Sequence, residues 1–119
     1  MHNDIVIADT SVLIAFNKLD ILDLLCEIYK EILIPEAVLK EYGTKLNKCF
    51  QVKKVNDIRL LGIIKDLNIG NGESEAIAMA FENKLPILID DLKARKIAKK
   101  LYLKVSGTIG VLVKLYNKN

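Results

Sequence analysis

Three short runs of apolar, mostly β-branched residues constrain the fold of this sequence more than any other feature. They occupy residues 5–8, 32–34 and 86–89 of the 119-residue chain. Runs of this length without polar alternation are typical of strands buried on both faces. Segments with helical spacing separate them, so strands alternate with helices. We therefore predict a single α/β domain over residues 1–119, in which helices cover both faces of a parallel sheet of about four to five strands, a three-layer α/β/α arrangement.

Apolar spacing, together with proline and glycine signals, predicts the remaining elements. Pro35 suits the first turn of a helix that continues to Tyr42, and Gly43 is its expected end. Further strands are expected near residues 51–55 and 103–105, and a turn at residues 70–72. The expected helices are residues 9–18, 21–29, 35–42, 58–67, 73–83, 91–102 and 107–118.

Acidic residues follow two of the three predicted strands. Asp9 comes directly after the first strand, and Asp90 and Asp91 come after the third. Because the strands of a parallel sheet end at one edge, where α/β proteins bind ligands, these acids are expected at a functional edge. Each aspartate could instead be a helix cap.

Two glutamates near helix ends could join them. Glu41 lies in the last turn of its expected helix, and Glu75 lies in the first turn of another, next to Glu73. Glu41 could also be a solvated surface residue, and Glu73 and Glu75 could simply favour a helix dipole. Carboxylates that share one pocket repel each other unless a cation such as Mg²⁺ or Mn²⁺ binds them. Such an ion can activate water and neutralise a phosphodiester in the transition state.

Other chemistries lack the residues that they need. His2 is the single histidine, so neither a zinc site nor a histidine-based nucleophile is expected. Cys26 and Cys49 have no metal-like spacing and are expected to be reduced thiols. No apolar run is long enough to span a membrane, and the first residues lack the features of a signal peptide. We therefore expect no membrane association and a cytoplasmic location.

The charge balance is compatible with a polyanionic substrate. The net charge is +3, and if four of the 15 acids share a pocket, the 18 Lys and Arg outnumber the other 11 acids by 7. These cations could contact a phosphodiester backbone, or they could form ordinary solvated faces. They concentrate in the expected helix 91–102, as Lys93, Arg95, Lys96, Lys99 and Lys100, and in the polar segment 44–57, as Lys45, Lys48, Lys53 and Lys54.

Five segments in order resemble a PIN domain of the small prokaryotic type. They read IVIADTSVLIAF (5–16), EILIPEAVLKEY (31–42), GNGESEAIAMAFENK (70–84), PILIDDLKARKIAKKL (86–101) and VSGTIGVL (105–112). The resemblance covers nearly the whole chain. It implies a ribonuclease dependent on Mg²⁺ or Mn²⁺, often the toxin of a toxin–antitoxin pair and often a homodimer.

The same resemblance implies which residues form the site. Asp9 would be the central metal ligand, and Glu41 and Glu75 would complete the pocket, directly or through water. Asp90 or Asp91 would be the fourth acid, the other capping a helix, with Asp90 slightly favoured. Glu75 stands where the toxins more usually have aspartate.

Weaker expectations concern the substrate and the partners. The hydroxyls of Thr10, Ser11 and Thr108 could hydrogen-bond the carboxylates or a phosphate, or cap helices. Lys93 and Arg95 could contact single-stranded or loop RNA. An apolar group on the first helices could form a dimer or antitoxin interface, although a core role is more typical of such residues. Its members are Leu13, Phe16, Leu22 and Leu25.

Two other functions compete with the ribonuclease. A non-catalytic RNA-binding or regulatory PIN-like module would fit the short chain and the glutamate at position 75. A receiver-like phospho-acceptor domain also gathers acids at strand ends. It has its acid pair after the first strand and a lone aspartate after the third, whereas here Asp9 comes first and the pair Asp90–Asp91 comes later.

Overall fold

A computed structural model describes residues 5–43 and 45–118, so His2 and Thr44, for example, lie outside the described part. The five strands are β1 (Ile5–Ala8), β2 (Glu31–Pro35), β3 (Phe50–Lys53), β4 (Ile87–Leu88) and β5 (Val105–Ser106). The helices are α1 (Thr10–Lys18), a 3-10 turn η1 (Leu22–Leu24), α2 (Leu25–Ile28), α3 (Glu36–Tyr42), α4 (Ile58–Lys65), α5 (Asn71–Asn83), α6 (Leu92–Lys100) and α7 (Thr108–Lys118).

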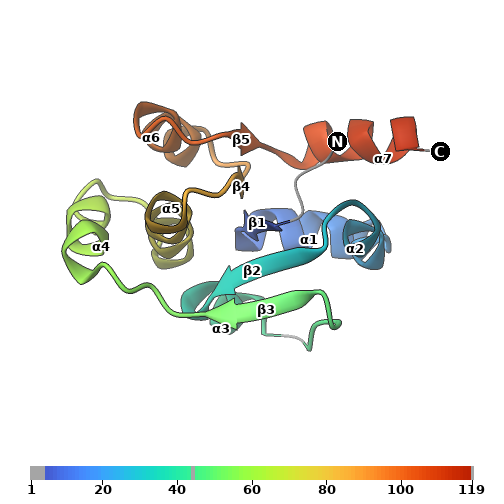
Figure 1. The fold of residues 1–119 in the computed structure, drawn as a ribbon, viewed down its shortest axis with the longest axis horizontal. Helices are drawn as coiled ribbons and strands as arrows, with labels where there is room; N and C mark the ends of the chain where they lie inside the picture. Colours follow the sequence, from blue (N-terminus) through green and yellow to red (C-terminus); the bar gives the residue numbers. More distant parts are fainter. Residues whose placement is uncertain (1–4, 44, 119) are drawn as a thin grey trace.

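The strands form one parallel sheet in the order β3-β2-β1-β4-β5 (Figure 1). β1 lies in the centre, with Val6 opposite Ile32 of β2 and Ile7 opposite Ile87 of β4. The chain first builds the sheet outward from β1 to β3 and then returns to add β4 on the other side. This reversal makes the carboxyl ends of β1 and β4 the place where such sheets bind ligands. The predicted parallel α/β fold is confirmed.

Apolar side chains on the two faces of the sheet form two separate cores, which gives the three layers. Val6 and Ala8 face a core shared with α1, α2, α3 and α7, whereas Ile7 faces one shared with α4, α5 and α6. Figure 1 shows α4, α5 and α6 on one side of the strands and α1, α2 and α7 on the other. Among the described residues, no helix is long and apolar enough to cross a membrane.

Two predicted elements differ in detail. The helical segment expected at residues 21–29 is present, as the 3-10 turn η1 followed directly by the one-turn helix α2. The turn expected at residues 70–72 is the start of α5, because the Gly70 carbonyl accepts the Ser74 amide at 2.9 Å as the first bond of the helix. Glu73 Oε1 accepts the Gly70 amide at 2.9 Å and stabilises this start.

The apolar group on the first helices belongs to the core. Leu13, Phe16 and Leu25 are completely buried, and Leu22 packs against them. Leu13, Phe16 and Leu25 are therefore unavailable to a partner and have the core role, whereas Leu22 is only partly buried.

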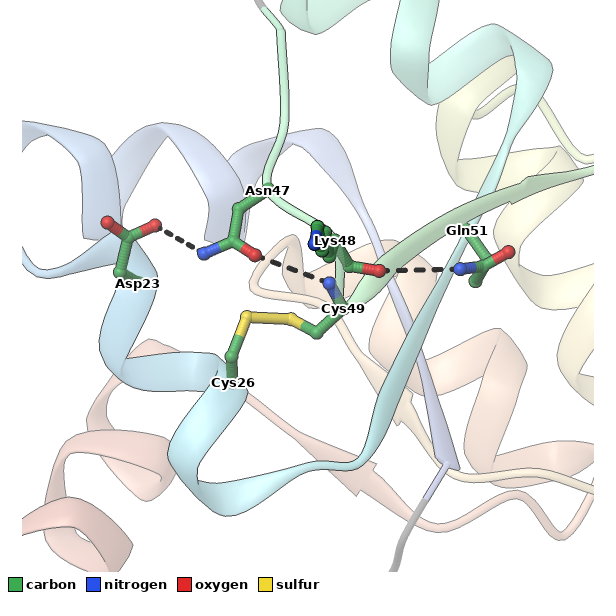
Figure 2. The surroundings of a disulfide bond; sticks show 6 residues. All are labelled: Asp23, Cys26, Asn47, Lys48, Cys49 and Gln51. Atoms are coloured by element: carbon green, nitrogen blue, oxygen red, sulfur yellow. Dashed lines mark hydrogen bonds between the residues drawn. A yellow bond between two sulfur atoms is a disulfide. The ribbon is translucent and has the colours of Figure 1, made fainter.

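Cys26 and Cys49 form a disulfide, so the expectation of reduced thiols was wrong (Figure 2). Parallel pairing of β3 with β2 brings Cys49, which precedes β3, beside α2, with a Cα–Cα distance of 5.7 Å. Asn47 strengthens this junction, since its Nδ2 donates to Asp23 Oδ1 at 2.9 Å and its Oδ1 accepts the Cys49 amide at 3.3 Å. The bond links α2 to the edge strand β3.

Reduction of the disulfide is expected to lower the free energy of unfolding by about 3 kcal/mol, because the bond closes a loop across a sequence separation of 23 residues. Urea unfolding with and without dithiothreitol measures the difference. The Cys26→Ala/Cys49→Ala variant is the control. Its urea midpoint should equal that of the reduced parent and should not change when dithiothreitol is added. A parent that unfolds identically in both buffers would contradict the bond.

Candidate active site

The Asp9 carboxylate lies at the end of β1 and is almost completely buried, with 2% of the residue exposed. Its Oδ2 accepts the Ser11 hydroxyl at 3.2 Å, whereas its Oδ1 accepts no hydrogen bond from any described residue. Asp9 occupies the cap position of α1, but its side chain makes no capping hydrogen bond. A helix cap therefore does not explain this buried carboxylate, and its free oxygen is available to a ligand.

Burial raises the pKa of Asp9 from 3.8 to about 6. The negative charge of Glu73 raises this pKa further, and the nearby Thr10 and Ser11 amide groups, together with the Ser11 hydroxyl, partly oppose the rise. The ionised carboxylate is thus costly in the free protein. A bound cation would remove this cost.

Glu41 of α3 is held by two donors, from Thr10 at the start of α1 and Gly72 at the start of α5. Thr10 Oγ1 donates to its Oε1 at 2.9 Å, and the Gly72 amide donates to its Oε2 at 3.2 Å. Thr10 is itself only 8% exposed. A Cβ atom at position 72 would overlap the Glu41 carboxylate, so only glycine leaves room for it. Glu41 therefore connects the start of α1 to the start of α5.

The two glutamates at the start of α5 have different partners. Glu73 accepts the Gly70 amide and is close enough to Asp9 to influence its pKa. Glu75 Oε1 accepts the Ala37 amide of α3 at 3.1 Å. The sequence interpretation of Glu73 as a plain first-turn residue missed its proximity to Asp9, because the spacing alone does not say which side of α5 faces the site.

The structure also separates the roles of the two aspartates after β4. Asp91 Oδ2 accepts the Ala94 amide at 2.9 Å and caps α6. Asp90 turns toward the start of α7, where its two oxygens accept the Thr108 amide at 2.7 Å and the Thr108 hydroxyl at 2.6 Å. A Cβ on Gly107 would come within 2.6 Å of Asp90 Oδ1, so a larger residue here would displace that carboxylate.

Two of the basic residues of α6 are bonded to backbone carbonyls, and the other three are exposed. Arg95 is half-buried and its Nη1 donates to the Ile89 carbonyl at 3.0 Å, which places it in the framework beside Asp90. Lys93 donates to the Asn68 carbonyl at 3.3 Å. Lys96, Lys99 and Lys100 are exposed.

The side chains of the site offer carboxylate oxygens, the ligands that a hard cation prefers. Each of the three hydroxyls considered from the sequence donates to a carboxylate: Ser11 to Asp9, Thr10 to Glu41 and Thr108 to Asp90. Among the described residues, no three acidic, Cys or His side chains are grouped closely enough to hold a metal ion. The free Oδ1 of Asp9 nevertheless fits one, because Mg²⁺ and Mn²⁺ take oxygen ligands and keep several waters.

Asp9 is expected to destabilise the metal-free protein at neutral pH. The pKa of Asp9 is higher in the folded than in the unfolded protein. The free energy of unfolding is therefore not reduced by Asp9 below pH 4, where the carboxyl is protonated in both states, and it falls as the pH rises through about 6. The rise of the pKa from 3.8 to about 6 corresponds to roughly 3 kcal/mol. Urea unfolding of the parent and of Asp9→Asn is measured in EDTA at pH 4 and pH 7.5. The free energy of unfolding of the variant, relative to that of the parent, should be higher at pH 7.5 than at pH 4. Parallel pH profiles would contradict this.

Gly72→Ala is expected to displace the Glu41 carboxylate and to lower the free energy of unfolding by about 1–3 kcal/mol, since its partly buried hydrogen bonds to Thr10 and Gly72 are lost. Gly62→Ala is the matched control. Nothing lies within 4 Å of its added Cβ, and in the interior of α4 alanine should stabilise by up to about 1 kcal/mol. Urea unfolding measures both, and equal stabilities would contradict the described position of Glu41.

Solved structures share this fold. PAE2754 from Pyrobaculum aerophilum matches with a TM-score of 0.69 and 13% identity, over 94% of this chain and 89% of that one. A PilT N-terminus domain protein from the hyperthermophilic archaeon Sulfolobus solfataricus P2 matches with a TM-score of 0.63 and 20% identity, over 93% of this chain and 92% of that one. At these identities the likeness concerns the fold alone.

Comparison at the level of sequence identifies the family. None of the curated proteins matches this chain at a significant level. The sequence profile described as a PIN domain matches residues 5–119, which is all but the first four residues. The match includes every acid described above, and the parallel five-stranded fold agrees with it. The chain therefore belongs to the PIN domain family, a family of nucleases that typically bind divalent metals.

Proposed function

We propose that this protein is a metal-dependent endoribonuclease that hydrolyses RNA phosphodiester bonds at the edge of the sheet marked by Asp9. The observation that carries the proposal is the nearly complete burial of the Asp9 carboxylate with one oxygen unpartnered. An acid in this state is costly unless it is protonated or bound to a cation. Its position where β1 and β4 end, at the reversal of strand order, supports a ligand site.

Asp9, Glu41 and Asp90, with one carboxylate from α5, would hold Mg²⁺ or Mn²⁺. The bound ion would supply an activated water and neutralise the developing charge on the phosphodiester. Thr10 orients Glu41 and Thr108 orients Asp90 through the hydrogen bonds described above. Asp91 acts on the site only through α6, because its carboxylate caps that helix.

The RNA backbone would follow the exposed lysines of α6. This helix starts directly after the acids at the end of β4, so Lys96, Lys99 and Lys100 lead away from the site. Phosphate contacts of this kind position a nucleic acid without reading its sequence. Arg95 contributes less, because its guanidinium is engaged with the backbone.

The finer parts of the proposal are the role as a toxin with an antitoxin partner, the homodimer and the cytoplasmic location. They rest on the family resemblance and on no contact described here. Cytoplasmic thiols are normally kept reduced. Unfolding in dithiothreitol, described above, thus also tells whether the chain stays folded under the conditions of that compartment.

A second candidate function is a non-catalytic RNA-binding module. It is favoured by the hydrogen bonds that already engage Glu41 and Asp90, and by the lack of a preformed group of three metal-holding side chains among the described residues. Such a module would bind RNA in a salt-dependent way without turnover. The cleavage assay below separates the two functions.

Cleavage of a mixed single-stranded RNA should require Mn²⁺ or Mg²⁺, stop in EDTA, and fall by roughly 100-fold or more in Asp9→Asn. The matched control is Asp91→Asn, which removes a carboxylate from the same edge of the sheet but should keep most activity, because asparagine caps a helix about as well as aspartate. Folded, metal-supplied parent protein that binds RNA without cutting it would favour the binding module. An active Asp9→Asn variant would refute the mechanism.

A further inference from the structure

We propose that Glu73, and not Glu75, is the carboxylate that α5 contributes to the site beside Asp9 and Glu41. This inference rests on the proposed function, because it assigns a ligand to the metal site proposed there. It concerns two glutamates that are two residues apart in the same helical turn. Successive residues of a helix are separated by 100°, so Glu73 and Glu75 point about 200° apart, to nearly opposite sides of α5.

One side of α5 holds neighbouring elements in place. Glu75 lies seven residues before Glu82, which puts both on the same side of the helix. Glu75 Oε1 accepts the Ala37 amide at 3.1 Å, at the start of α3. Glu82 accepts the Asn56 and Asp57 amides, the latter at 2.8 Å, just before α4. Both carboxylates thus accept hydrogen bonds from backbone amides of neighbouring segments of the same chain, which is a structural role.

The other side of α5 leads to the acids. Because α5 leads back to the start of β4, its first turn lies at the edge where the strands end. The bond between the Gly72 amide and Glu41 confirms that this turn adjoins the site, and Glu73 is the next residue. Its carboxylate is held there by the Gly70 amide.

Asp9 supplies an independent reason to expect a ligand at this point. Its carboxylate is 2% exposed, and its Oδ1 has no partner among the described residues. Glu73 directly follows Gly72, whose amide donates to Glu41, whereas Glu75 accepts the Ala37 amide on α3. Two nearby carboxylates, one with an unpartnered buried oxygen, form a site that a hard divalent cation would relieve of repulsion.

The test is a titration of the intact protein with Mn²⁺, in which the free ion is measured by its electron paramagnetic resonance signal. Glu73→Gln should weaken binding by roughly tenfold or more, the effect expected for loss of a group at a metal site. Glu75→Gln is the matched control with the same change of charge and size. It should bind Mn²⁺ like the parent but unfold at a lower urea concentration, because the Ala37 amide loses a charged acceptor.

The outcomes separate this assignment from the proposed function. Loss of Mn²⁺ binding in Asp9→Asn and Glu73→Gln, with retention in Glu75→Gln, supports both. If Asp9→Asn loses the ion while Glu73→Gln keeps it, or if Glu75→Gln weakens binding as much as Glu73→Gln, the assignment of Glu73 is overturned and the metal site at Asp9 stands. If the folded parent binds no Mn²⁺, both proposals fail.

Discussion

The pairing of β1 with β2 on one side and with β4 on the other is the constraint on which the rest of the molecule depends. The Asp9 amide donates to the Leu88 carbonyl at 2.9 Å, so the backbone at the end of β1 is fixed to β4 before the chain turns into α1. The side chain is then held where the strand order reverses, between helices from both layers. Burial of Asp9 is therefore a consequence of the topology, and its raised pKa is a consequence of that burial.

The acids near this edge differ in how freely they could change partners. Asp90 accepts two hydrogen bonds from Thr108, and Glu41 accepts one each from Thr10 and Gly72. Asp9 alone among these three has a buried oxygen without a partner. A cation that binds Asp9 first would gain its charge without breaking a hydrogen bond, whereas recruitment of Asp90 or Glu41 would cost part of an existing network. The site is thus organised around one open ligand and two restrained ones.

Sequence reasoning succeeded where local patterns determine the structure and failed where the tertiary fold does. The buried strands and the left-handed Gly43 at the end of α3 followed from residue types alone. The start of α5 did not, because glycine and asparagine suit a turn and a helix start equally well, and the bond from Gly70 to Glu73 decides between them. The disulfide was missed because the contact of Cys49 with Cys26 depends on the pairing of β3 with β2. Likewise, the spacing shows that Glu73 and Glu75 diverge but not which of them meets Asp9.

The structural role of Glu75 also accounts for its departure from the aspartate that the resemblance leads one to expect at this position. The carboxylate must reach from α5 to the Ala37 amide on α3, and aspartate is shorter by one methylene group. The same helix carries a second glutamate, Glu73, in its first turn and on the side of Asp9, so a longer residue at position 75 costs the site nothing. α5 thereby separates two tasks: Glu75 bonds a neighbouring helix, and Glu73, which accepts the Gly70 amide at the start of its own helix, is the carboxylate that would meet a cation. Gly72 and Glu73 lie in the first turn of α5. The residue at which this helix starts therefore determines where both of them point.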